Sequence, residues 1–518
     1  MTELVASIFA PTVATLNQRA TAAFARGANG VEVRVDAFEG DPAALNAYLR
    51  AAADQSWIVT CRCEREGGRS RAAPAQRAQR IAAVARGTRA RIDFEWSDWT
   101  SQPEVRATIL AELGPRPGDR LILSTHNFDG PFENPRRIVQ AILADPTGAT
   151  AKVAYRVRHI NESFTALDLM HDHGERVTAI AMGEDGLWSR LLARKLGGAI
   201  CYASLEDESA TASGQVSLSD MVERYRFDRM DPGTKVYGVV GEPVGHSLGP
   251  VLHNRWFSVY DINAVYLPLR VRPEGDGLAA FLDGCTRRPW LGVAGLSVTV
   301  PHKEAALRWL GDGADPLAAG VGAVNTLVFQ ADRVRGHNTD CYAAAASLVE
   351  ALACKPSALV GSRVDVLGAG GAARAVLVGL REYGCLTTVY ARSPERSGSL
   401  AREFDCESAP WDHRVRRRGD VVINCTSVGM WPDTDRSPLP PNALRGCRLV
   451  FDLIYNPPET RLMRDASAAG ARAINGLDMF VRQAATQFEL WTGVAADRSA
   501  EYRWIAGVST GRSTERAE

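Results

Sequence analysis

Lysine is scarce in this chain. Lys and Arg together number 60 of 518 residues, yet lysine occurs only at positions 152, 195, 235, 303 and 355. Arginine stays protonated under essentially all conditions, whereas a desolvated lysine can lose its proton and act as a nucleophile or base. Lys152, near the start of the strand-like run "TAKVAYRV", therefore invites a chemical explanation. For one lysine taken alone, drift in composition is the simpler explanation.

Net charge and long apolar runs are lacking as well. The 60 acidic residues balance the 60 basic ones, which gives no general reason to bind nucleic acid or an anionic membrane. No run is apolar enough to span a bilayer, and "MTELVASIFAP" has no basic segment before a long apolar run. The ten cysteines are dispersed, which favours reduced thiols. We expect a cytoplasmic globular protein of two to four domains whose partners are small molecules, with no metal.

The first 226 residues alternate short β-rich runs with helical segments. Eight such runs, from "LVASIFAP" to "AICYASLE", predict a (β/α)8 barrel over residues 1–226. In that fold the polar residues at the carboxyl ends of the strands form the active site. The residues at these positions are Glu32, Arg34, Arg62, His126, Lys152 and Arg190.

These side chains suit one kind of chemistry when they are taken together. Carboxylate and guanidinium groups bind the hydroxyls and the carboxylate of a small polyol acid. His126 lies one strand before Lys152 and could serve as a general acid and base beside a Schiff base, with Glu66 orienting its imidazole. Each residue alone has an ordinary structural explanation, such as an arginine paired with a carboxylate. Their joint placement favours an active site.

The runs "EVRVD", "TCRCEREGG", "STHNF", "AKVA", "MGEDGLWSR" and "TASGQ" resemble, in order, the motifs of type I 3-dehydroquinate dehydratase. The resemblance implies that Lys152 forms an imine with the substrate ketone, that His126 moves protons and that Glu66 positions His126. It also implies a substrate-binding set of Glu32, Arg34, Arg62, Arg190, Thr211 and Gln215. Thr211 stands where the family usually has serine, and Asn127 where aspartate often follows the histidine.

A second α/β region follows a predicted linker at 227–234. Its run "RVDVLGAGGAARAVLVGL" reads as strand, glycine turn and helix, which is typical of a dinucleotide fold. The predicted phosphate-binding turn comprises Gly368, Ala369, Gly370, Gly371 and Ala372. The next strand ends in "YARSPERS", without the acidic residue of an NAD site. Arg392, Ser393 and Arg396 there suit a 2′-phosphate, so NADP is the expected cofactor.

Lys303 and Asp340 could form a proton-transfer pair across a cleft. Their runs, with "GEPVGHSLGPVLHN", "GAVNTL", "INCTSVGM", "DLIYNPPET" and "NGLDMFVRQAA", resemble shikimate dehydrogenase from about residue 236 to 505. The resemblance implies a catalytic Lys303 and Asp340, substrate contacts by Ser247, Gly249, Thr299, Asn325, Tyr455 and Gln483, and cofactor contacts by Thr426 and Gly476. It implies a substrate domain over 235–343 completed by 475–507, and a cofactor domain over 344–474. Residues 508–518 are expected to be disordered.

Two departures from this second family pattern concern ligand contacts. Ala391 replaces an asparagine that commonly precedes the phosphate-binding arginine. Gly249 replaces the second serine of the usual substrate-carboxylate motif, which leaves Ser247 alone and raises the possibility of quinate as a substrate.

The two resemblances belong to consecutive steps. Dehydration of 3-dehydroquinate yields 3-dehydroshikimate, whose ketone the second half would reduce with NADPH. We therefore expect a bifunctional enzyme of the shikimate pathway. Two alternatives stay open: a second half that acts partly or mainly as a quinate dehydrogenase, and a non-catalytic module that senses quinate or shikimate. A sensing module should lack the nucleophile, whereas this chain keeps Lys152, His126, Lys303 and Asp340.

Overall fold

The computed structural model describes residues 1–205, 215–245, 247–274 and 277–509. Thr211 and residues 510–518 of the predicted tail lie outside the described residues. Contacts between backbone segments divide the chain into two units: Met1–Val236 with Phe257–Gly292, and Tyr237–Trp256 with Val293–Glu518. The domain boundaries expected from the sequence stay a prediction.

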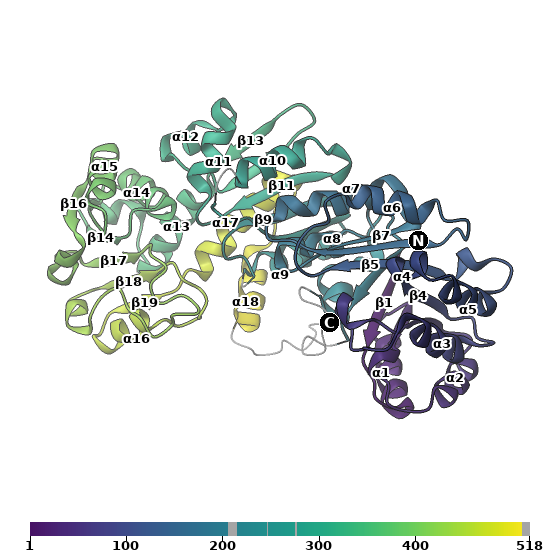
Figure 1. Ribbon diagram of the computed structural model, residues 1–518. Coiled ribbons are helices and arrows are strands. Elements are labelled where there is room, and N and C mark those ends of the chain that lie inside the picture. The colour runs from purple at the N-terminus through teal and green to yellow at the C-terminus, as the bar shows by residue number, and fades with distance from the viewer. Residues whose placement is uncertain (206–214, 246, 275–276, 510–518) are drawn as a thin grey trace. The chain divides into compact units, whose positions relative to one another are not determined.

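The first unit is built around eight parallel strands in the order β7-β6-β5-β4-β3-β2-β1-β8 (Figure 1). The Ala199 N–H, just before β8, donates to the Val177 carbonyl at 2.9 Å, which links the two end strands and makes the barrel nearly closed. The expected (β/α)8 barrel is confirmed. Its strands are β1 (Glu3–Ile8), β2 (Gly30–Arg34), β3 (Ser56–Thr60), β4 (Arg91–Glu95), β5 (Leu121–Asn127), β6 (Thr150–Arg156), β7 (Val177–Met182) and β8 (Ile200–Ala203).

Helices alternate with these strands, and several begin at side chains that cap them. Thr12 accepts from the Thr15 N–H ahead of the first helix, and Asp41 accepts from the Ala43 N–H ahead of the second, which also has proline at its first position. The helices are α1 (Val13–Ala25), α2 (Pro42–Ala51), α3 (Pro74–Ala85), α4 (Trp96–Ser101), α5 (Pro103–Leu113), α6 (Pro135–Leu143), α7 (Phe164–His173) and α8 (Leu187–Leu191).

The barrel interior has an apolar part and a polar part. A buried cluster from six strands is made of Val5, Ile58, Ile122, Ala154, Ile180, Met182, Ile200 and Tyr202. Polar side chains occupy paired positions on neighbouring strands: Ser7 beside Glu32, Thr60 beside Asp93, and Ser124 beside Lys152. Because side chains alternate between the two faces of a strand, this register carries all six polar groups toward one interior region.

The second family resemblance covers two further sheets. The first has five strands in the order β10-β9-β11-β12-β13: β9 (Lys235–Gly241), β10 (Ala264–Arg270), β11 (Val293–Val298), β12 (Thr326–Phe329) and β13 (Val334–His337). The helices in this part of the chain are α9 (Gly249–Val259), α10 (Gly277–Thr286), α11 (Lys303–Leu310), α12 (Pro316–Val321), α17 (Leu477–Thr492) and α18 (Arg498–Ser509). Helix α17 returns to lie beside β11, β12 and α13 (Asp340–Leu352) (Figure 1).

The other sheet is a parallel Rossmann-like sheet in the order β16-β15-β14-β17-β18-β19. One face packs on a core that includes Val366, Ala375 and Leu400, and the other on a core that includes Leu439 and Leu462. Its strands are β14 (Arg363–Leu367), β15 (Leu386–Ala391), β16 (Glu407–Pro410), β17 (Val421–Asn424), β18 (Leu449–Asp452) and β19 (Arg472–Ile474), and its helices are α13 (Asp340–Leu352), α14 (Gly371–Glu382), α15 (Pro394–Phe404) and α16 (Arg461–Ala468).

Across the described part of the chain, none of the helices is both long and apolar enough to cross a membrane.

Candidate active sites

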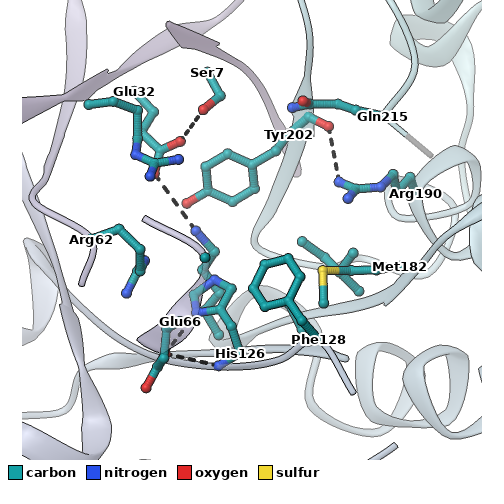
Figure 2. A pocket seen from close by; sticks show the side chains of 15 residues that line it. Ser7, Glu32, Arg62, Glu66, His126, Phe128, Met182, Arg190, Tyr202 and Gln215 are labelled. Carbon is teal, nitrogen blue, oxygen red and sulfur yellow. Dashed lines mark hydrogen bonds and ion pairs between the residues drawn. The ribbon is translucent and has the colours of Figure 1, made fainter. Parts of the chain in front are cut away.

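A pocket opens among the inward side chains of the barrel (Figure 2). Its empty volume is about 520 Å³, open solvent at the mouth included. Every residue of the first predicted set that the structure describes lines it: Glu32, Arg34, Arg62, Glu66, His126, Lys152, Arg190 and Gln215. Figure 2 shows Arg62 and Arg190 on opposite sides of the pocket, with the Tyr202 ring between them.

Lys152 projects from β6 and is 4% exposed. Its Nζ donates to Asp93 Oδ2 at 2.8 Å, lies 3.9 Å from Glu32 Oε1, and lies 3.9 Å from the centre of the Tyr202 ring. The amine therefore sits between two carboxylates and an aromatic face, at a point that the pocket exposes to a small ligand.

Asp93 is the centre of the charges in this pocket, although its side chain is itself fully buried. It accepts from Arg62 at 2.5 Å and from the Ser124 hydroxyl at 2.6 Å, besides Lys152. Burial alone would raise the pKa of Asp93, but the positive charges of Arg62 and Lys152 outweigh it and hold this pKa well below its usual range. Asp93 thus stays ionised and offsets the two cations.

His126 and Glu66 form the second pair of the barrel site. His126 stands near the end of β5, next to β6, and the Glu66 carboxylate lies 3.0 Å both from its Nδ1 and from its backbone nitrogen. Burial and the nearby charges of Arg62 and Lys152 lower the pKa of His126 well below its usual value, so the imidazole is neutral. Burial also raises the pKa of Glu66 to about 7. With Nδ1 bonded to Glu66, Nε2 is the ring nitrogen left to exchange a proton.

The remaining barrel residues differ in how their charge is balanced. Glu32 accepts from the hydroxyls of Ser7 and Thr60, the latter at 2.8 Å. Arg34 donates two hydrogen bonds to Asp36, at 3.0 and 2.9 Å. Arg190 instead donates to the Tyr202 carbonyl at 3.4 Å, and no carboxylate pairs with it among the described residues. Burial lowers its pKa, so an anionic ligand would relieve this buried charge.

In the second unit Lys303 and Asp340 meet directly. Each stands at the first residue of its helix, α11 and α13, and Lys303 Nζ donates to Asp340 Oδ2 at 2.6 Å. Asn325 lies beside them, fully buried, where its amide bonds to the Thr339 side chain at 2.9 Å and to the Thr339 N–H at 2.9 Å. Thr299 follows the end of β11, four residues before Lys303.

Three more predicted substrate residues, Ser247, Gly249 and Tyr455, come together near the start of α9. The Gly249 N–H, at the first residue of α9, donates to Ser247 Oγ at 3.1 Å. Burial raises the pKa of the Tyr455 phenol, and its hydrogen bond with Ser247 opposes that rise. Gln483 on α17 is half-buried and donates to the Phe480 carbonyl at 3.0 Å.

The predicted cofactor residues lie at the carboxyl edge of the Rossmann-like sheet. Gly368 follows β14 with φ +110°, and Gly371 begins α14 at a place where a Cβ would lie 3.2 Å from Lys303 Cδ. Glycine thus permits both the turn and the close approach of the helix end to the Lys303 side chain. Ala369, Gly370 and Ala372 belong to the same turn, and Thr426 and Gly476 follow β17 and β19.

The expected 2′-phosphate site stands after β15. Arg392 and Arg396 are exposed, and no carboxylate pairs with either of them in the described residues. Ser393 caps α15 by accepting from the Arg396 N–H at 3.2 Å, but its hydroxyl also donates to Glu395 at 2.8 Å. Two exposed guanidinium groups at the start of a helix suit a phosphate, although the Glu395 carboxylate stands beside them.

Several residues of both sites were not predicted from the sequence. In the barrel these are Asp93, Ser124, Ser7, Thr60 and Tyr202. A charged residue inside the apolar run "RIDFEW" was the available signal for Asp93. In the second unit Gln487 was missed. It is one helical turn after Gln483, accepts from Ser297 at 2.7 Å and donates to the Asn325 carbonyl at 3.2 Å.

Comparison with known families agrees with this geometry. Residues 4–232 match the family described as type I 3-dehydroquinase. Residues 239–327 match the shikimate dehydrogenase substrate binding domain, and residues 476–500 match the shikimate 5'-dehydrogenase C-terminal domain.

Relatives cover either both halves or the second half. A chloroplastic bifunctional 3-dehydroquinate dehydratase/shikimate dehydrogenase of Arabidopsis thaliana is 36% identical over 403 residues, which is 74% of this chain and 65% of that protein. NADP(+) shikimate dehydrogenases of Methanosarcina acetivorans and Moorella thermoacetica are 42% and 44% identical over about half of this chain, and the matches cover 94% and 88% of those proteins. Through its second half the chain belongs to the shikimate dehydrogenase family, and its first half matches the family of type I 3-dehydroquinases.

Proposed function

We propose that the chain dehydrates 3-dehydroquinate at the barrel site and reduces the product, 3-dehydroshikimate, to shikimate at the second site. The observation that carries the first step is the buried Lys152 amine, held 2.8 Å from Asp93 in the same pocket as the His126 and Glu66 pair. A lone buried cation between carboxylates is an ordinary structural feature. A lysine beside a neutral imidazole with a free nitrogen, in a pocket open to a ligand, is suited to imine chemistry.

The dehydration follows from these groups. The Lys152 ammonium passes protons to the ketone oxygen as its nitrogen adds to the ketone carbon, and water leaves as the protonated imine forms. His126 Nε2 takes a proton from the neighbouring carbon, and the electron pair moves into the imine. The resulting enamine expels the hydroxyl group with a proton returned from His126. Water then cleaves the imine, which frees Lys152 and releases the unsaturated ketone.

Binding of the substrate is assigned to the basic residues on both sides of the pocket. Arg190 lacks a carboxylate partner among the described residues and is buried, so it is the guanidinium best suited to the substrate carboxylate. Arg62 already pairs with Asp93, and Arg34 with Asp36, so both are better suited to holding their neighbours and the hydroxyls of the ring.

For the second step, Lys303 and Asp340 would exchange a proton with the carbonyl oxygen that is reduced. The glycine turn after β14 and the exposed Arg392 and Arg396 fit an NADP dinucleotide, with the pyrophosphate at the α14 N-terminus and the 2′-phosphate at the arginines. Bound NADPH supplies the hydride. The curated relatives of this half are named as NADP(+) shikimate dehydrogenases.

Quinate is a second candidate substrate for this half. The family pattern expects two serine hydroxyls at the substrate carboxylate, and here Gly249 contributes only its N–H, which already donates to Ser247. The missing hydroxyl leaves room for the additional ring hydroxyl of quinate. We expect both alcohols to be oxidised, shikimate faster. Specificity constants with NADP⁺ for the native protein and for Gly249→Ser decide this, and quinate that is not oxidised, or an unchanged ratio in the variant, would count against it.

A coupled assay tests the main proposal. The full chain is mixed with 3-dehydroquinate and NADPH, and the loss of NADPH absorbance is followed. Lys303→Ala should stop NADPH consumption while the unsaturated ketone accumulates. Lys152→Ala should stop the formation of that ketone and therefore NADPH consumption as well. Added 3-dehydroshikimate should restore NADPH consumption in Lys152→Ala. The proposal fails if the native chain consumes no NADPH when it is given 3-dehydroquinate and none when it is given 3-dehydroshikimate. The expected cytoplasmic location stays a prediction, since the Arabidopsis relative is named as chloroplastic.

A further inference from the structure

A segment from the shikimate dehydrogenase part of the sequence packs against two loops of the barrel. Residues 257–292 belong to the barrel unit, although they fall inside the stretch that matches the dehydrogenase substrate binding domain. Strand β10 contacts α8 and the 3-10 turn η6 (Glu184–Gly186), and α10 contacts the turn η4 (Ile160–Ser163). These turns follow β7 and β6, the strands next to the pocket.

The apolar part of this packing centres on Trp188 in α8. Its ring lies 5.2 Å from Phe164 and 5.6 Å from Phe281, the latter on α10, and both Trp188 and Phe281 are almost completely buried. Gly284 on α10 faces Phe164 so closely that a Cβ would lie 2.3 Å from the ring. Close packing of three aromatic rings of this kind fixes their positions.

Ion pairs surround the aromatic contact. Asp185, in η6, lies 3.2 Å from the Arg272 guanidinium and 3.9 Å from Arg270, and its side chain is 5% exposed. Arg288 donates to both oxygens of Asp168 on α7, at 2.6 and 2.9 Å. A nearly buried carboxylate with two arginines holds its loop more firmly than an exposed pair would.

Helix α8, which these aromatic and ionic contacts hold in place, carries Arg190. Helix α8 has five residues, too few to be stable as an isolated helix. On its barrel side Ser189 bonds to the backbone of Ala181 and Gly186. On its other side Asp185 and Trp188, which flank the start of α8, contact the 257–292 segment. Arg190 follows Trp188 by two residues and lines the pocket.

We propose that residues 264–274 and 277–288 act as a clamp that positions Arg190, so that the dehydrogenase part of the chain completes substrate binding by the dehydratase. Arg272 and Phe281 are positioning residues of the dehydratase, though neither lines its pocket. This inference rests on the proposed function of the barrel site. Because the clamp acts on binding of the carboxylate and not on the imine, its loss should raise KM more than it lowers kcat.

The test uses the full chain with Arg272→Glu, Arg272→Lys and Phe281→Ala. Arg272→Glu places a carboxylate against Asp185 and should raise KM for 3-dehydroquinate by about tenfold with kcat changed less than about twofold. Arg272→Lys keeps the charge and should stay close to the native protein. The matched control is Arg333→Glu, the same charge change at an exposed arginine that bonds to Gln330 in a turn of the other unit.

Hydrogen exchange of the peptide that spans residues 184–192 is measured on the same proteins. We expect faster exchange in Arg272→Glu and Phe281→Ala, and native exchange in Arg333→Glu. Unchanged exchange in both clamp variants, or faster exchange with an unchanged KM, would overturn the proposal. If Phe281→Ala does not fold, the variants of the half-exposed Arg272 decide the test on their own. Should the native protein lack dehydratase activity, the proposed function fails, while the exchange result still reports on whether the clamp exists.

Discussion

Replacing Asp93 by asparagine tests whether one carboxylate offsets both cations of the barrel pocket. Asp93 lies 2.8 Å from Lys152 and 2.5 Å from Arg62, and its side chain has no exposed surface. Asparagine keeps the shape and one acceptor oxygen but removes the charge. The variant therefore leaves two buried cations without their common partner, while the packing around position 93 changes little.

The cost of removing one member of a buried ion pair is about 3 to 5 kcal/mol. For a domain of the size of the barrel, this loss of unfolding free energy corresponds to a fall in Tm of roughly 6 to 20 °C. The control Asp172→Asn breaks an ion pair with Arg136 in which both side chains are nearly half exposed, and it should cost at most about 1 kcal/mol.

The dependence on pH gives the reasoning a second check. The charges of Arg62 and Lys152 depress the folded-state pKa of Asp93 below its unfolded value of about 3.9. The stability that Asp93 contributes is therefore fully present above that unfolded value and is lost as the pH falls through the folded one. The difference between the native protein and Asp93→Asn should be constant above about pH 5 and shrink in acid.

The assay must report on the barrel alone, since the chain has more than one cooperative unit. Hydrogen exchange is measured in a urea series on peptides that span β4 to β6. A loss below about 1 kcal/mol, or a loss as small as that of Asp172→Asn, would refute the view that Asp93 holds the two cations together.

Three other predictions use the same protein. The dehydratase kcat/KM should rise with pH through about 7, because Glu66 ionises there and then holds His126 Nδ1. Glu66→Gln should remove this rise from the pH profile. A rise that persists in the variant would argue against Glu66 as the group that titrates. Arg392→Ala and Arg396→Ala together should weaken the preference for NADPH over NADH by roughly tens- to hundreds-fold. The control Arg402→Ala, at an exposed arginine farther along α15, should leave this preference unchanged. A native protein that prefers NADH would contradict the phosphate site. Asp340→Asn should lower shikimate oxidation at least about 100-fold without changing dehydration, and retained oxidation would exclude Asp340 as a proton-transfer group.

Much of the barrel site was predictable because the order of the strands along the chain determines which strands are neighbours in the barrel. The runs that hold His126 and Lys152 are consecutive, and consecutive strands of a barrel pair in parallel, so the two side chains had to be neighbours. Glu66 was harder to place, since it comes from a 3-10 turn after β3 and reaches His126 across 60 residues of sequence. Its place in the run "EGG" suggested that it could orient the imidazole, and the family resemblance implied the same role.

Asp93 was missed for a physical reason. Asp93 stands in the middle of β4, where the alternating pattern turns it toward Lys152. Its burial depends on two cations from other strands, and a sequence does not show which distant charges will meet. The same limit hid Gln487, whose contact with Asn325 spans 162 residues.

The packing of β10 and α10 on the barrel could not be foreseen at all. Apolar residues such as Trp188 and Phe281 fit a core on either side of the predicted linker, and periodicity does not say which surfaces pack together. Only the structure brings the segment to the turn η6 and to helix α8, which carries Arg190.

Borohydride trapping tests the central claim, an imine on Lys152, most directly. The full chain is treated with borohydride in the presence of 3-dehydroquinate, digested, and examined by mass spectrometry. The reduced adduct should lie on the peptide that contains Lys152, with loss of dehydratase activity and no loss of shikimate oxidation. Lys152→Arg should give no adduct and no dehydration, because a guanidinium does not form the imine. An active enzyme after treatment, an adduct on another lysine, or dehydration that survives Lys152→Ala would contradict the account.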